Sequence, residues 1–131
     1  MKQYLTALLI GFSILSMFSC KKDAAGPAST QHDVSSVAGP SSGSINTAVK
    51  LTVTYPYSNG CDYIGSFDKT VSGTIVFIKA YSKQVPKESI CTQDAGSRTI
   101  EYDFTSGSTG TFELRFMKRD GSFISHVIVV Q

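Results

Sequence analysis

The sequence predicts an all-β protein whose folded part is an antiparallel, immunoglobulin-like β-sandwich of about six to seven strands. Three observations support this prediction. From residue 48 onward, short segments alternate apolar and polar residues with the period of strands. The same region is rich in Ser, Thr, Gly, Val and Ile, which is strand and turn composition. No segment of it repeats apolar residues at helical spacing over several turns.

The chain begins with a predicted signal peptide, residues 1–19. Lys2 supplies a positive charge, and a largely apolar run follows over residues 5–19. This run is shorter than the roughly twenty residues that a membrane-spanning helix needs. A charged start, a short apolar stretch and a small residue at the end are typical of secretory signal peptides.

Cys20 is the predicted site of lipidation. Met17 stands three places before it and Ser19 directly before it, which resembles the lipobox of bacterial lipoproteins. Phe18 departs from that pattern, because the middle position is usually small. Two or three acyl chains on this cysteine, palmitate among them, would hold the protein to a membrane far more firmly than one chain alone. The alternatives are a signal peptide with an incidental cysteine and a cytosolic protein with an apolar N-terminal helix.

Residues 20–47 are predicted to be the lipidated cysteine and a flexible linker, and residues 48–131 the folded domain. Small and polar residues dominate the linker, with Gly-Pro near both ends and no apolar periodicity. Such a spacer would let the folded part clear the lipid headgroups. His32 lies in this segment, and we expect it to be solvated.

Each strand of the domain is predicted from its own pattern. Residues 49–55 alternate strictly, and Pro56 ends the segment. Residues 74–81 are apolar on both faces, which predicts a central strand or one with a covered second face. Asp120-Gly121 is a hairpin signal between the last two strands. The full set of predicted strands is 49–55, 63–67, 69–71, 74–81, 99–104, 112–117 and 123–130.

Charge and cysteine content limit the classes of partner. The formal net charge is +2, and basic and acidic residues are interspersed, so we expect no nucleic-acid partner. Cys61 and Cys91 form an even pair once Cys20 carries lipid, which in an exported chain predicts a disulfide. Two free thiols remain the alternative. No Cys-x-x-Cys spacing occurs, so we expect no metal site on these cysteines.

Five stretches resemble small secreted lipoproteins of the Bacteroidota that combine a relaxed lipobox with one immunoglobulin-like domain. They are LTVTYPYSNGCDYIGSF, VFIKAYSK, CTQDAGSRTIEYDF, TGTFELRF and SFISHVIVVQ. The resemblance covers residues 48–131 and the signal, with Asn59-Gly60-Cys61 and Cys91-Thr92-Gln93 as its most distinctive pieces. It implies the fold and a lipid-anchored place at the outer membrane, and no activity. Lys21-Lys22-Asp23 resembles a surface-export signal with one acid only, so cell surface and periplasmic face stay open.

The domain offers few groups for catalysis. His126 is its one histidine, and alternation places it on the same side as Ile124 and Ile128. Ser125 beside it faces the other way, so the two cannot act together. We therefore predict that the protein is not an enzyme and uses no cofactor.

Aspartates are scattered through the predicted turns and strands, without the spacing of a calcium loop. We expect solvated turn residues and no metal. The alternative is a turn calcium site from Asp62, Asp68 or Asp94.

The candidate binding residues are Tyr57, Tyr63 and Phe67, which surround Cys61 in a predicted end loop. Binding residues favour loops on rigid scaffolds, and tyrosine suits protein or sugar surfaces. The alternative is that these rings pack over the disulfide as a local cap.

The favoured function is a non-catalytic, lipid-anchored module that binds a protein or polysaccharide at the cell envelope. One alternative is a structural accessory subunit of an outer-membrane complex, which would bury the second apolar face of strand 74–81. Another is an inhibitor of a secreted enzyme, which would need a rigidly projecting loop, with Gln84–Cys91 as the candidate.

Overall fold

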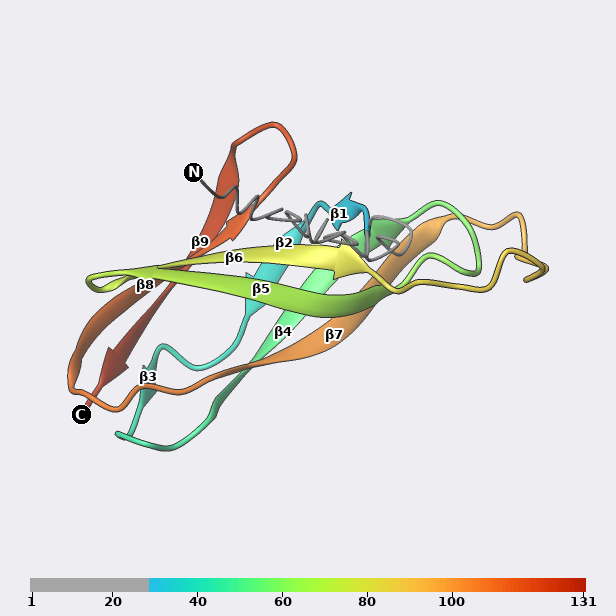
Figure 1. The fold of residues 1–131 in the computed structure, drawn as a ribbon. Coiled ribbons are helices and arrows are strands. Elements are labelled where there is room, and N and C mark those ends of the chain that lie inside the picture. The colour runs from blue at the N-terminus through green and yellow to red at the C-terminus, as the bar shows by residue number, and fades with distance from the viewer. Residues whose placement is uncertain (1–28) are drawn as a thin grey trace, which may run out of the picture.

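The computed structural model describes residues 29–131 and confirms an all-β sandwich of two sheets (Figure 1). The described residues form nine strands and contain no helix that could cross a membrane. The predicted signal peptide (residues 1–19) and Cys20 lie outside the described residues.

The larger sheet has six strands. At its centre, β6 pairs with β5 along one edge, and β8 and the short β1 pair with the other. Beyond β8 lie β9 and then β3. The bounds are β1 Gln31–His32, β3 Ser42–Gly43, β5 Ile64–Ser72, β6 Ile75–Ser82, β8 Gly110–Met117 and β9 Phe123–Val130.

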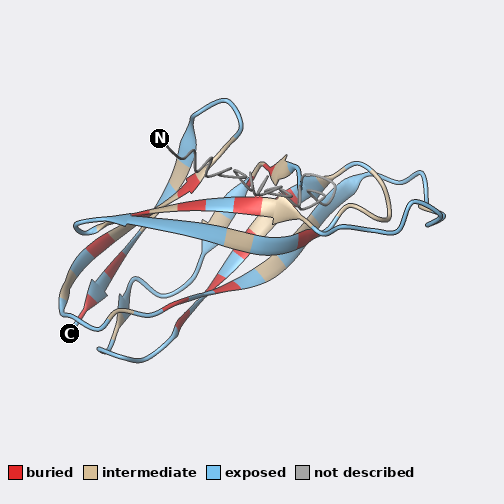
Figure 2. Ribbon diagram, viewed as in Figure 1, coloured by how far each residue is buried: buried red, intermediate tan, exposed pale blue. Residues whose placement is uncertain are grey.

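The smaller sheet has three strands in the order β2-β4-β7. Their bounds are β2 Ser36–Ala38, β4 Val49–Tyr57 and β7 Gly96–Phe104. The alternation that predicted these strands recurs as burial: Leu51 and Val53 on β4 are fully buried between the sheets, and their neighbours face outward. The buried positions recur at alternate places along the strands (Figure 2). Phe116, Leu114 and Ile128 of the larger sheet complete the centre of the core.

Two details of the predicted sandwich are wrong. The short strands expected at 63–67 and 69–71 are one strand, β5, with an irregularity between Ile64 and Ser66. The sheets are also not wholly antiparallel, since β6 pairs with β8 in parallel and β3 pairs with β9 in parallel. Parallel neighbours need a crossover. Between β6 and β8, the chain makes this crossover through β7 of the smaller sheet. The Asp120-Gly121 hairpin is confirmed, with Gly121 at φ 85°.

The linker prediction is wrong for the part of it that the structure describes. β1, β2 and β3 all come from that segment and pair with β6, β4 and β9. Val34 is 2 % exposed and belongs to the core. His32, expected to be solvated, is 8 % exposed. Small polar residues can pair wherever a neighbouring strand offers a free edge, so the absence of apolar periodicity did not reveal these strands.

Candidate binding site at the disulfide end

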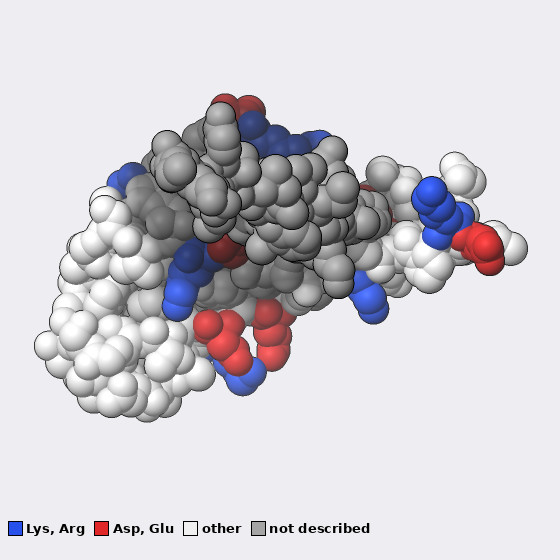
Figure 3. All heavy atoms as spheres, viewed as in Figure 1, with Lys and Arg blue, Asp and Glu red and all other residues white. Residues whose placement is uncertain are grey.

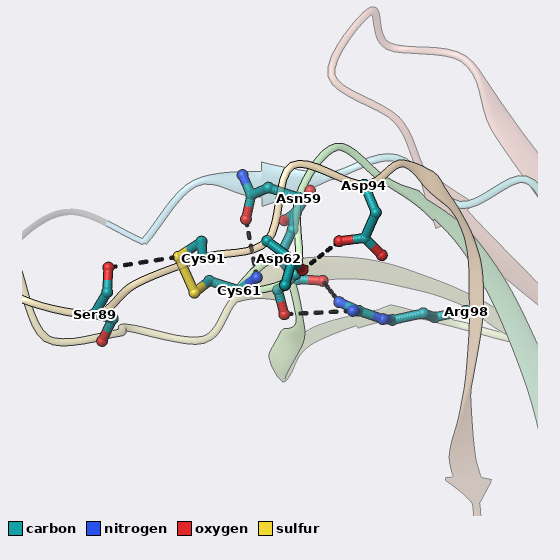
Figure 4. Close-up of a disulfide and its surroundings, with 9 residues drawn as sticks. Asn59, Cys61, Asp62, Ser89, Cys91, Asp94 and Arg98 are labelled. Atoms are coloured by element: carbon teal, nitrogen blue, oxygen red, sulfur yellow. Dashed lines mark hydrogen bonds between the residues drawn. A yellow bond between two sulfur atoms is a disulfide. The ribbon is translucent and has the colours of Figure 1, made fainter.

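The predicted disulfide is present between Cys61 and Cys91, whose Cα atoms lie 5.2 Å apart. It joins the β4–β5 loop (58–63) to the β6–β7 loop (83–95) at one end of the sandwich (Figure 4). The backbone N–H of Gly60 also donates to the carbonyl of Thr92 at 2.9 Å. A side chain at position 60 would overlap the Thr92 hydroxyl, so glycine is needed for this close approach.

The β4–β5 loop is a tight turn built by Asn59. Its side-chain oxygen accepts a hydrogen bond from the backbone N–H of Cys61 at 2.9 Å. Its carbonyl accepts a second from the N–H of Asp62 at 3.1 Å. This side-chain to backbone pattern is the usual role of asparagine in turns. These two hydrogen bonds fix the backbone at Cys61, which forms the disulfide.

Arg98 on β7 holds the predicted binding tyrosines in place. Its guanidinium lies 3.9 Å from the Tyr57 ring centre and 4.0 Å from that of Tyr63. The same group donates to the carbonyl of Asp62 at 2.7 Å and to that of Gly60 at 3.3 Å (Figure 4). Stacking of this kind contributes roughly 0.5–1 kcal/mol at exposed sites. Tyr57 and Tyr63 therefore sandwich Arg98 and brace the loop.

The hydroxyl of Tyr57 donates to the Asp94 carboxylate at 3.1 Å, which ties β4 to the β6–β7 loop. This hydrogen bond raises the pKa of Tyr57. A hydrogen bond from the Thr92 hydroxyl lowers the pKa of Asp94. Asp94 is thus occupied in fixing the loop, and it does not converge with Asp62 and Asp68 on a cation.

Phe67 does not belong to this site. It lies on β5, and its ring meets the Tyr102 ring edge-on at a centroid distance of 5.1 Å. It packs against the core. The prediction that Phe67 joins Tyr57 and Tyr63 in an outward loop surface is therefore wrong, because Phe67 lies within β5 and its ring faces Tyr102 of the smaller sheet.

A polar cleft of about 370 Å³ lies between β1 and the β4–β5 loop. On one wall, His32 Nε2 lies 2.6 Å from Asp62 Oδ1, a close contact without the alignment of a hydrogen bond. On the other, Arg119 donates to Asp33 from its backbone and its guanidinium, at 2.8 Å each. The hydrogen bond from the Arg119 side chain lowers the pKa of Asp33. The His32–Asp62 pair links β1 to the β4–β5 loop, and the Asp33–Arg119 pair links the residue after β1 to the β8–β9 turn. All four residues line the cleft.

The β6–β7 loop projects beyond the ends of the strands that it connects (Figure 1). Ile90, one residue before Cys91, is 99 % exposed, and Val85 in the same loop is also exposed. Side chains of both charge signs gather on this projecting part (Figure 3). No sequence pattern had singled out Ile90.

The remaining candidate groups lie apart from this end. His126 shares the core-facing side of β9, as alternation predicted, opposite Leu114. Its Nε2 lies 3.0 Å from the carbonyl of Pro40. Within residues 29–131, no three His, Cys, Asp or Glu side chains converge as metal ligands do.

The comparison with protein families bears on the fold. The model of the ORF11 beta-sandwich domain matches residues 51–128, more than half of the chain. The chain belongs to the ORF11 beta-sandwich domain family. The family match runs from β4 to β9, so it includes both disulfide-linked loops and excludes β1, β2 and β3. No curated protein and no solved structure matches the chain. Family membership therefore establishes a sandwich, and the function has to be argued from the site.

Proposed function

We propose that this protein is a lipid-anchored, non-catalytic module of the cell envelope that binds another protein through the β6–β7 loop. The observation that carries the proposal is Ile90, which is 99 % exposed and adjacent to the disulfide-bonded Cys91. Burying an isoleucine side chain contributes about 1.5–3 kcal/mol. An apolar side chain that enters a well-packed pocket of a partner can act as an interface anchor.

Preorganisation supports the same loop. The disulfide, the Gly60–Thr92 hydrogen bond and the Tyr57–Asp94 hydrogen bond fix it at three places. A loop that is already ordered loses less conformational entropy when a partner binds. An inhibitor of a secreted enzyme and an accessory subunit of an outer-membrane complex are two forms that such a partner relationship can take.

The lipid anchor rests on the sequence. The apolar run that ends at Cys20, and the resemblance to Bacteroidota lipoproteins with a relaxed lipobox, support it. An outer-membrane place, at the cell surface or the periplasmic face, follows from that resemblance. Attachment to the membrane would raise the effective concentration of the domain near partners at the envelope. A small contact surface would then be sufficient to bind such a partner.

Position 90 provides the test of binding. A photocrosslinking residue at Ile90 in cells is expected to capture a partner protein as a discrete adduct, and the same residue at the exposed Ser125 of β9 is not. Ile90→Asp places a charge in the proposed contact and is expected to weaken the partner's affinity about tenfold or more, whereas Ser125→Asp leaves it unchanged. Equal crosslinking from both positions, or none from either, would contradict the proposal.

Metabolic labelling tests the anchor separately. Radiolabelled palmitate is expected to enter the wild-type protein, and Cys20→Ala is expected to abolish the label because no other side chain near the cleavage site can form the thioether. The matched control is Ser19→Ala, which keeps a small residue before the cysteine and so retains the label. Palmitate incorporation that survives Cys20→Ala would rule out lipidation at this position.

Polysaccharide binding is a second candidate, favoured by the polar cleft beside His32, Asp33 and Arg119. Its carboxylates and guanidinium would bind hydroxyl groups. A glycan array probed with the protein distinguishes the two functions, because Asp33→Asn would weaken glycan binding and leave capture from position 90 intact.

A further inference from the structure

On one side of the sandwich, the larger sheet extends further than the smaller sheet. There, β5 is the edge of the larger sheet and β7 the edge of the smaller one. The contact between the rings of Phe67 and Tyr102 shows that these edges lie against each other. Within the described residues, β5 pairs only with β6, and β7 pairs only with β4, so each presents a free edge.

Among the described residues, no strand lies opposite part of the core-facing side of β5. Its core-facing residues pair with Ala80, Ile78 and Val76 of β6, all of which are buried. These three core-facing residues of β5 are Phe67, Lys69 and Val71. The ring of Phe67 is covered by that of Tyr102. The other two, Lys69 and Val71, are exposed, and Val71 is 56 % exposed. The smaller sheet therefore stops one strand short of covering β5.

A groove opens into the core at this place. It has a volume of about 260 Å³ and is lined by apolar side chains of both sheets, by Lys69 and by the polar segment 105–108 that follows β7. Val76 comes from the larger sheet, and Phe104 from the end of β7. The Phe104 ring packs on that of Phe112 at 5.5 Å and forms part of the floor. The groove thus combines buried apolar side chains with a polar rim that carries one cation.

The edge of β7 is regular, and that of β5 is not. Nine consecutive residues of β7 pair with β4 without a shift in register, and none of the nine is proline. Such an edge presents a row of backbone groups ready to accept another strand. β5 carries an irregularity between Ile64 and Ser66 and the core-facing Lys69, both of which discourage strand addition.

We propose that an extended segment of a partner protein adds to the free edge of β7 as a fourth strand of the smaller sheet. Its alternate apolar side chains lie on Phe67 and Val71 and enter the groove. An acidic side chain of the segment pairs with Lys69, which makes no ion pair within residues 29–131. Main-chain hydrogen bonds give such strand addition its affinity, and the alternate pockets give it selectivity.

Charge argues against a second copy of this chain as the occupant. The outward face of β7 carries Glu101 and Asp103. Pairing of two β7 strands would bring these carboxylates close to their own counterparts on one face, and like charges across strands destabilise a pair. Lys50 binds both carboxylates within its own sheet, at 3.1 and 3.2 Å, and is not free to bridge to another copy.

Selection from a displayed library of seven-residue peptides, with the full mature chain in detergent as target, tests this proposal. The enriched peptides are expected to alternate apolar residues and to carry one Asp or Glu. They should protect alternate amides of β7 from hydrogen exchange. Lys69→Glu is expected to weaken their binding about tenfold, and exchange of the peptide acid for lysine should restore it.

The matched control is Lys79→Glu, an exposed lysine on the outer face of β6, which should leave peptide binding unchanged. Ile90→Asp should also leave it unchanged, so failure of the loop proposal and failure of this one are distinguishable. Three outcomes would overturn strand addition: no enriched peptide, peptides indifferent to Lys69→Glu, or protection at β5 or the 83–95 loop in place of β7. Sedimentation showing dimers with β7 protected would assign the edge to a second copy instead.

Discussion

Replacement of both Cys61 and Cys91 by serine is expected to lower the free energy of unfolding by about 3–4 kcal/mol. The disulfide joins residues separated by 30 positions, and the cost follows from the chain entropy that this closed loop removes from the unfolded state. For a domain of this size, such a loss lowers the melting temperature by about 10–20 °C. Urea denaturation followed by circular dichroism measures it, since the chain has no tryptophan for fluorescence.

The Cys20→Ala chain lacking residues 1–19 is the suitable background, because it carries neither lipid nor a third thiol. Reductant added to it should reproduce the loss, and added to the double-serine variant it should change nothing. A loss below about 1 kcal/mol would show that the unfolded chain retains contacts between the two loops, so that the disulfide removes little of its entropy.

Val34→Asp is expected to destabilise the fold by at least about 3 kcal/mol. Val34 is 2 % exposed and packs in the core between β1 and β2. A carboxylate there would lose its hydration without gaining a partner. Had residues 20–47 been a flexible linker throughout, the same substitution would have no effect on stability.

Ser36→Asp is the matched control, since it introduces the same charge two residues away at an exposed position of β2. It is expected to change stability by less than about 0.5 kcal/mol. The two variants compared by urea denaturation separate a core residue from a spacer residue. Equal midpoints for Val34→Asp and Ser36→Asp would mean that this segment does not pack as described.

Docking of the N-terminal segment also affects the proposed anchor. The sandwich begins at Gln31, so the spacer from Cys20 is much shorter than a linker that ends at residue 47. Fully extended, residues 20–30 reach at most roughly 35–40 Å. A lipidated Cys20 would therefore hold the β1 end of the sandwich, with its polar cleft, within that distance of the membrane.

The long strands could be predicted from the sequence because each satisfies a local rule. In β4 and β8, apolar residues recur at every second position, which is sufficient to place one face against a core. The even cysteine pair predicted the disulfide for an equally simple reason. Pairing order obeys no such local rule, so neither the parallel β6–β8 ladder nor the merging of two short strands into β5 could be derived.

The candidate site depended still more on tertiary contacts. Tyr57 and Tyr63 were identified as aromatic residues near a cysteine, but their role is set by Arg98, which is about forty residues away in sequence and stacks between them. The exposure of Ile90 depends on where the β6–β7 loop projects. The free edge of β7 depends on the pairing of the smaller sheet, which has three strands within residues 29–131.

By itself, the sequence determined an all-β domain, its long strands, its disulfide and a candidate lipidation signal, because periodicity, composition and cysteine count are properties of short stretches of chain. Only the tertiary structure decided that β1, β2 and β3 belong to the sandwich, which residues brace the loops, and which edges stay free. Those features depend on which neighbour a strand finds across the fold. Backbone hydrogen bonding makes almost any polar segment able to pair once such a neighbour is present.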